Sequence, residues 1–137
     1  MSYLIDTNVL SELRKRDRCN AGVLAWFETV DDADLFLSVL IVGEIRRGIE
    51  LVRRRDAVGA RALDRWLSGL ELRYHDRILP ITLEIARLWG SVSLAQPLAP
   101  IDGLLAATAL HHRLTLVTRN VRDVARAGVE VLNPFRH

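Results

Sequence analysis

The sequence predicts an α/β domain with a central parallel sheet flanked by helices. Three observations indicate this class: short apolar runs, amphipathic stretches between those runs, and polar or acidic residues directly after several of them. Strands that alternate with helices favour a parallel sheet that is covered on both faces. The chain has 137 residues, which is the length of a single ordinary domain.

The first half of the chain is expected to hold two strands and four helices. The run Tyr3–Ile5 predicts a buried strand that ends at Asp6, and residues 35–37 predict a second strand that ends at Ser38. Ser38 is a suitable N-cap for the helix that follows. Apolar residues recur at helical spacing in four segments, and the helices expected there span residues 7–14, 21–30, 39–55 and 57–74.

The second half is expected to continue the alternation with three strands and three helices. Strands are expected at residues 78–81, 114–118 and 129–132. Thr82 is a suitable cap for a helix that reaches about residue 95. A proline-bounded loop over 96–100 then precedes a helix that begins at Asp102. The last two helices are expected over residues 102–112 and 120–127.

The basic residues exclude several kinds of phosphate chemistry. Of 19 basic residues 18 are Arg, and the single Lys15 lies in the polar run RKRDR. No Walker A sequence is present, and this lysine is poorly placed for a kinase or a Schiff-base enzyme. The arginine excess has two explanations, codon usage in a GC-rich genome or selection for phosphate binding.

Cysteine content and hydropathy indicate a cytoplasmic protein without a membrane anchor. Cys19 is the only cysteine, so neither an internal disulfide nor a cysteine-rich zinc site is expected. The N-terminal segment lacks the pattern of a signal peptide, and no apolar run has the length of a transmembrane helix.

Acidic residues follow or flank several predicted strands. Asp6 follows the first strand, Glu44 lies in the helix after the second, and Asp123 follows the fourth together with Thr118 and Asn120. Asp102 opens the helix before that fourth strand. Ligands of parallel sheets collect outside the carboxyl ends of the strands, so these acids are expected at one edge.

A structural role is an alternative for each acid taken singly. Asp6 fits a surface turn, and Asp102 fits a favourable charge at a helix N-terminus. Glu44 has arginines nearby on its own helix, and Asp123 fits a helix cap. Taken together, clustered carboxylates repel one another unless a cation neutralises them. Oxygen ligands without His or Cys favour Mg²⁺ or Mn²⁺ over zinc.

Four sequence strings, in chain order, resemble those of the PIN-domain ribonucleases, specifically VapC- or FitB-type toxins of bacterial toxin–antitoxin pairs. The strings are LIDTNVLSEL at 4–13, LSVLIVGEIRRGIE at 37–50, PIDGLLAATALHHRLTLVTRNVRDV at 100–124 and VLNPF at 131–135. The resemblance implies a single three-layer PIN-like domain over residues 1–137, with a parallel sheet of about four to five strands. One departure is Val124, where many relatives have Phe after the last acid.

The resemblance implies an endoribonuclease that depends on Mg²⁺ or Mn²⁺. By position, Asp6, Glu44 and Asp102 match the three acids of the family motif, and Asp123 matches a more variable fourth acid. These four are the expected catalytic and metal-binding residues, and metal-activated water would attack the phosphodiester phosphorus in line. Four further polar residues match positions that shape the pocket and contact substrate: Thr7, Asn8, Ser38 and Asn120.

Charge is distributed unevenly along the chain, which suggests where RNA phosphates bind. Residues 1–45 hold four basic and eight acidic residues, whereas residues 46–77 hold nine basic and five acidic residues. An acidic pocket needs basic contacts nearby to hold a phosphate. Arg46 and Arg47 lie beside Glu44 in sequence, and Arg119 lies beside Asn120, so these three arginines are the expected RNA contacts. A solvated helix face remains the alternative for many of the other arginines in the basic segment.

The resemblance also implies partners: a second copy of the chain and a cognate antitoxin protein. An antitoxin segment would lie in a groove and block the acidic site, and the complex would bind promoter DNA through the antitoxin. The apolar helices at 21–30 and 39–52 are candidates for that groove or for plain core.

A non-catalytic PIN-fold partner of an antitoxin is the alternative function. A response-regulator receiver is disfavoured because no lysine follows the last strand. Cleavage of DNA is a third alternative, which the sequence supports less than cleavage of RNA.

Overall fold

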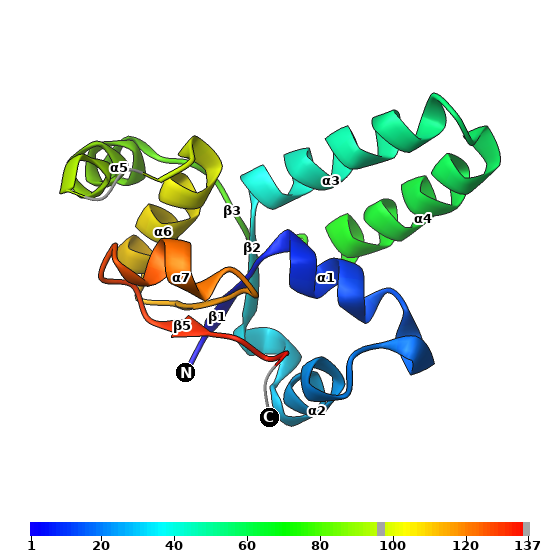
Figure 1. Cartoon of the computed structure of the whole chain (residues 1–137), viewed down its shortest axis with the longest axis horizontal. Helices are drawn as coiled ribbons and strands as arrows, with labels where there is room; N and C mark the ends of the chain where they lie inside the picture. The colour runs from blue at the N-terminus through cyan, green and yellow to red at the C-terminus, as the bar shows by residue number, and fades with distance from the viewer. Residues whose placement is uncertain (96–97, 136–137) are drawn as a thin grey trace.

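Five parallel strands form one sheet at the centre of the protein (Figure 1). The computed structural model describes residues 1–95 and 98–135. The strands lie in the order β3-β2-β1-β4-β5, so the first strand of the chain is the central one. Their bounds are β1 Tyr3–Ile5, β2 Leu35–Ser38, β3 Ile78–Leu79, β4 Thr115–Val117 and β5 Val131–Leu132. The predicted α/β class with a parallel sheet is confirmed.

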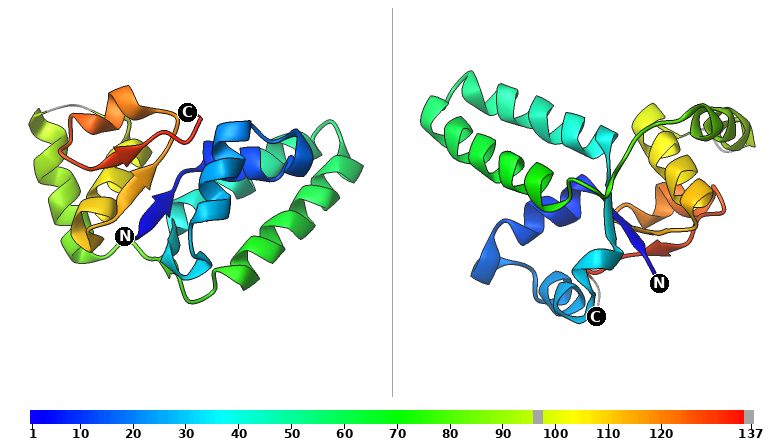
Figure 2. Two further views of the ribbon diagram at one scale, coloured as in Figure 1. Left: turned by 90° about the horizontal axis from the view of Figure 1, so that it is seen from below. Right: turned by 180° about the vertical axis from the view of Figure 1, so that it is seen from behind.

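Helices cover both faces of the sheet and complete a three-layer arrangement (Figure 2). One layer holds α1 to α4, and the other holds α5 to α7. The bounds are α1 Thr7–Leu13, α2 Ala21–Thr29, α3 Val39–Arg53, α4 Ala57–Arg73, α5 Leu83–Ala95, α6 Pro100–His112 and α7 Val121–Ala125. Two short 3₁₀ turns, Arg16–Arg18 and Asp32–Asp34, were not anticipated from the sequence.

Two of the strands pass directly into helices, and this positions the polar edge of the sheet. Asp6 follows β1 and caps α1, since its side chain accepts a hydrogen bond from the backbone N–H of Thr7. Ser38 ends β2 and caps α3 by accepting from the backbone N–H of Leu40 at 3.1 Å. Both strands run parallel, so the two helices begin at the same edge.

The core lies between the sheet and its two helical layers. Strand residues Leu4, Ile5 and Leu116 are almost fully buried, and the helices add Ile41 and Leu105. Each such side chain contributes on the order of 1.5–3 kcal/mol when it leaves water. This packing fixes the strand ends, and therefore fixes the backbone from which the polar edge is built. In the described residues no helix is long and apolar enough to cross a membrane.

Several element boundaries differ from those expected. The strand predicted at 78–81 ends at Leu79, because Pro80 has no N–H with which to continue the ladder. The helix predicted from Asp102 begins at Pro100, where the missing N–H costs nothing in the first turn. Pro100 therefore belongs to α6 rather than to the predicted loop, while residues 96–97 of that loop lie outside the described residues.

Candidate active site

Asp6 occupies the tip of the central strand. Its backbone N–H continues the sheet by donating to the Val117 carbonyl at 2.9 Å. One carboxylate oxygen, Oδ1, accepts from the Thr7 backbone N–H at 2.8 Å. The side chain is half-buried. Asp6 therefore has two positions at once: it caps α1 through one oxygen, and its carboxylate lies at the carboxyl edge of the sheet.

A small hydrogen-bond network orients the other oxygen of Asp6. The buried Thr118 hydroxyl donates to Asp6 Oδ2 at 2.8 Å. The Asn8 amide nitrogen lies 3.5 Å from the same oxygen and 3.4 Å from the Thr118 hydroxyl. Thr118 Oγ1 also accepts from the Asn120 backbone N–H at 3.0 Å. Sequence reasoning placed Thr118 after the fourth strand but gave it no role; the string TRN was the available signal.

Glu44 reaches the same edge from the second turn of α3. Its Oε1 accepts a hydrogen bond from the Thr7 hydroxyl at 2.9 Å, which ties α3 to the start of α1. Burial raises the pKa of the Glu44 carboxyl, and the neighbouring charges of Asp6 and Asp102 raise it further, while the Thr7 hydrogen bond lowers it. Glu44 is therefore a carboxylate whose charge the surroundings disfavour.

Asp102 comes to this edge from the other helical layer. It lies in the first turn of α6, two residues after the helix begins, where its charge interacts favourably with the helix dipole. Burial nevertheless raises the pKa of its carboxyl, and the charges of Asp6 and Asp123 add to that effect.

The turn that carries Asp102 is packed closely against α5. A Cβ atom at Gly103 would lie 2.8 Å from Trp89 Nε1 and 2.9 Å from its Cδ1. Only glycine at this position lets the indole ring rest on the backbone of α6, and the contact sets where the first turn of α6 lies. The glycine stands directly after Asp102, so packing between two helices sets the position of the acid.

Asp123 and Asn120 lie at the start of α7. Asn120 is the N-cap residue of α7, but its side chain makes no capping hydrogen bond. Asp123 is exposed in the first turn, and its charge contributes to raising the pKa of Asp102. The proposed fourth acid is thus close enough to act electrostatically on the third.

The four acids lie in or cap four separate helices and influence one another electrostatically, and no cation of the described chain forms an ion pair with them. Within residues 1–95 and 98–135, no Lys, Arg or His forms an ion pair with Asp6, Glu44, Asp102 or Asp123. In the same residues, no three acidic, His or Cys side chains stand close enough to close around a metal ion as they are. The oxygen-only donor set fits a hard divalent cation, which would have to draw the carboxylates together.

Ser38 and Arg46 differ from the roles expected for them. The Ser38 side chain is fully buried and caps α3, so it is not accessible for contact with a substrate. Arg46 lies two residues from Glu44, which places it on another face of the helix. There it pairs with Asp64 of α4 at 2.7 Å and with Glu50 at 3.2 Å. Its guanidinium is therefore engaged in an ion-pair cluster away from the acids.

Arg47 and Arg119 remain available for contact with an anion. Arg47 is exposed, and no described residue forms an ion pair with it. The backbone N–H of Arg119 donates to Asn8 Oδ1 at 3.2 Å, and its guanidinium lies 4.1 Å from the centre of the Phe135 ring. Phe135 lies in the string VLNPF, from which no role for its side chain could be predicted.

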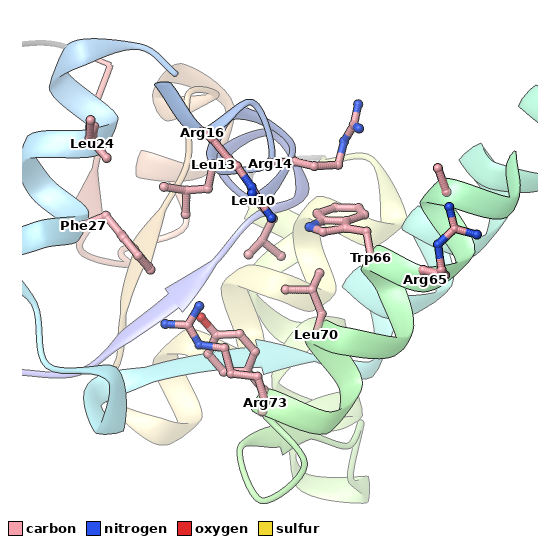
Figure 3. Close-up of a pocket in the computed structure, with 12 residues that line it drawn as sticks. Leu10, Leu13, Arg14, Arg16, Leu24, Phe27, Arg65, Trp66, Leu70 and Arg73 are labelled. Carbon is pink, nitrogen blue, oxygen red and sulfur yellow. The ribbon is translucent and has the colours of Figure 1, made fainter. Parts of the chain in front are cut away.

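A groove of about 500 Å³ opens between α1, α2 and α4 (Figure 3). Its floor is apolar and aromatic, with Leu10, Phe27 and Trp66, and arginines such as Arg14 and Arg65 stand around it. The helix at 21–30, one of the two candidates for a groove, contributes Leu24 and Phe27 to its lining. The helix at 39–52 does not line the groove, because the α3 face packs on α4, and α1 and α4 supply the remaining walls.

Comparison with known proteins gives a consistent result for sequence and structure. A model of the PIN domain matches residues 3–129. The chain is 32% identical to "Toxin FitB" of Neisseria gonorrhoeae, over 96% of this chain and 97% of that protein. It is 31% identical to "VapC ribonuclease Y4jK" of Sinorhizobium fredii, over 96% of each.

Solved structures extend the likeness to three dimensions. The crystal structure of FitAcB from Neisseria gonorrhoeae contains a chain that superposes with a TM-score of 0.89 at 31% identity, covering 98% of this chain and 99% of that one. A toxin–antitoxin complex from Klebsiella pneumoniae contains another, with a TM-score of 0.70 at 26% identity and coverage of 97% and 98%. With this fold, these motifs and these relatives, the chain belongs to the PIN-domain family.

Proposed function

We propose that this chain is the toxin of a type II toxin–antitoxin pair and that it cleaves RNA with the help of Mg²⁺ or Mn²⁺. The observation that carries the proposal is the group of acids Asp6, Glu44 and Asp102 at one edge of the sheet, which interact electrostatically and have no cation partner in the described chain. The name of the Sinorhizobium relative supports ribonuclease activity, and that of the Neisseria relative supports a toxin.

The side chains divide the tasks of binding the cation and the substrate. Asp6 is oriented by Thr118 and Asn8, and Glu44 is held by Thr7, so two carboxylates are aimed before any ligand arrives. Asp102 supplies the third oxygen ligand, and Asp123 binds a cation or positions water from the exposed side. A bound Mg²⁺ or Mn²⁺ would supply charge for the transition state and a nucleophile from water. Thr7, Asn8 and Asn120 line the approach for the RNA backbone.

The groove between α1, α2 and α4 is the proposed seat of an antitoxin. It is lined by apolar and aromatic side chains, which suit a peptide segment of a partner protein. The similar chain from Klebsiella comes from a toxin–antitoxin complex, and this supports the proposal that the present chain also binds an antitoxin. Binding of promoter DNA by the complex, through the antitoxin, and a homodimer of this single-domain chain belong to the same proposal. A cytoplasmic location fits its one cysteine and an RNA substrate.

Cleavage of total RNA by the purified chain tests the function. We expect fragments with Mg²⁺ or Mn²⁺ and none with EDTA. Asp6→Asn should abolish cleavage while leaving the protein folded, because asparagine caps a helix as well as aspartate does. Equal cleavage by the wild type and by Asp6→Asn would contradict the assignment of the site. No cleavage by a folded wild-type chain that still binds an antitoxin would favour the non-catalytic alternative.

A further inference from the structure

We infer that Phe135 is a positioning residue for RNA: it holds the guanidinium of Arg119, the second residue after β4, with its N–H groups available to a substrate phosphate. The inference rests on the proposed function, since it adds the anion contact that an acidic nuclease site needs. It assigns a role to Phe135, which follows strand β5 and which the acid site leaves unexplained.

The backbone of Arg119 is fixed relative to Asp6. Its N–H donates to Asn8 Oδ1 at 3.2 Å, and the amide nitrogen of Asn8 lies 3.5 Å from Asp6 Oδ2. The preceding residue, Thr118, donates to that same Asp6 oxygen. Arg119 is therefore tied to the candidate metal site by two short connections.

The Arg119 side chain is held by an aromatic face rather than by a carboxylate. Its guanidinium carbon lies 4.1 Å from the Phe135 ring centre, while Arg119 itself is exposed and Phe135 half-buried. The ring has its own anchor, because the Phe135 backbone N–H donates to Asn133 Oδ1 at 3.0 Å. Stacking occupies the face of the guanidinium and leaves its in-plane N–H donors available for bidentate contact with a phosphate.

Other arginines of the chain show the contrasting arrangement. Arg46 and Arg53 direct their donors to Asp64 and Glu50, and Arg77 pairs with Asp32. Within residues 1–95 and 98–135, no carboxylate forms an ion pair with Arg119. Arg119 is thus an exposed cation that follows Thr118 of the candidate site, and its side-chain donors form no ion pair in the described chain. Its charge contributes to lowering the pKa of the Glu12 carboxyl on α1.

RNA binding without cleavage tests the phosphate contact. In the Asp6→Asn background with EDTA, binding of a single-stranded RNA oligonucleotide is measured over a range of KCl concentrations. Arg119→Ala should weaken binding and reduce the slope of log K against log salt by about 0.7, as expected for one lost phosphate contact. Arg126→Ala is the matched control: it removes the same charge from an exposed residue after α7, from which the chain runs on to the opposite edge of the sheet. An equal change with both variants would overturn the inference.

The role of Phe135 is tested by a double-mutant cycle. Phe135→Leu keeps apolar bulk but removes the aromatic face, so we expect a Kd about two- to fivefold higher. Phe135→Tyr should restore the wild-type value. In the Arg119→Ala background, Phe135→Leu should have no further effect, because the cation it holds is gone. The same factor in both backgrounds would show that Phe135 only packs, and would overturn the inference.

Cleavage kinetics separate failure of this inference from failure of the proposed function. With Mg²⁺ present, Phe135→Leu should raise KM by the same factor and leave kcat within about twofold. A wild type that cleaves RNA while Arg119→Ala leaves KM and the salt slope unchanged would overturn the inference alone. The wild type could instead be folded but fail to cleave RNA, while the Kd values of the variants change as the double-mutant cycle predicts. That result would overturn the nuclease proposal and support the phosphate contact. Melting curves of each variant show that the fold is retained.

Discussion

The α3–α4 hairpin and the acidic edge of the sheet both gather charged side chains, but they balance them differently. On the hairpin, Arg46 and Arg53 of α3 both reach Asp64 of α4 at 2.7 Å, and Glu50 joins the same cluster. At the edge, burial and then the charge of Asp6 raise the pKa of both Glu44 and Asp102, and no cation among the described residues pairs with them. The hairpin charges are satisfied within the chain. The edge charges have no such partner among the described residues, and this difference separates a structural cluster from a candidate site.

Removing one acid from the edge should give the largest effect. Asp102→Asn keeps the size of the side chain but removes an oxygen charge, so we expect RNA cleavage in Mg²⁺ to fall by about 100-fold or more. Initial rates on a labelled RNA measure this loss. Retention of more than a tenth of the wild-type rate would show that Asp102 is not part of the cleavage site.

Adding a divalent cation should stabilise the edge and leave the hairpin unchanged. We expect millimolar Mg²⁺ to raise the melting temperature of the wild type by several degrees, because a ligand that binds only the folded state stabilises it. Glu44→Gln should lose most of this increase. NaCl at matched ionic strength is the control, and an equal increase with NaCl would mean that general screening explains the shift.

The pH dependence of stability should report the burial and repulsion of the acids at the edge. The pKa values of Glu44 and Asp102 are raised in the folded state above their ordinary values of 4.5 and 3.8, so the folded state binds protons more tightly than the unfolded state. Glu44 and Asp102 therefore contribute most to the free energy of unfolding at low pH, and this contribution is lost as the pH rises above their ordinary pKa values. Without metal, the melting temperature of the wild type should fall relative to Asp102→Asn as the pH rises from about 4 to 7. A constant difference between the two proteins would contradict the raised pKa of Asp102.

Breaking the hairpin cluster should give the smallest effect. Asp64→Asn removes the carboxylate that Arg46 and Arg53 share, but these side chains are partly exposed, so water compensates for much of the loss. We expect the melting temperature to fall by no more than a few degrees and RNA cleavage to remain unchanged. A large loss of cleavage without unfolding would show that the hairpin takes part in catalysis or substrate binding.

The order of strands and helices could be predicted from the sequence, because apolar runs and helical periodicity are local signals. Boundaries were less accurate where proline acts: Pro80 shortens β3, and Pro100 starts α6 two residues before Asp102. Polar residues at strand tips could also be located, since parallel strands end at one edge.

The partners of side chains could not be predicted, because they depend on how distant helices pack. Arg46 is close to Glu44 in the sequence, yet the turn of α3 directs it to Asp64, which belongs to another helix. Ser38 matched a pocket position, and only the structure shows that its hydroxyl is buried as a cap. The groove likewise depends on how α1, α2 and α4, which are separate in the sequence, come together in the fold.

The contact between Trp89 and Gly103 couples α5 and α6, two helices of the smaller layer, to the acid that precedes the glycine. A side chain larger than hydrogen at 103 would have to displace a rigid indole or the first turn of α6. We expect a substitution there to lower activity by shifting Asp102, although every carboxylate would still be present. Alanine, serine and valine at this one position would form a series of increasing side-chain size, and we expect activity to fall along that series.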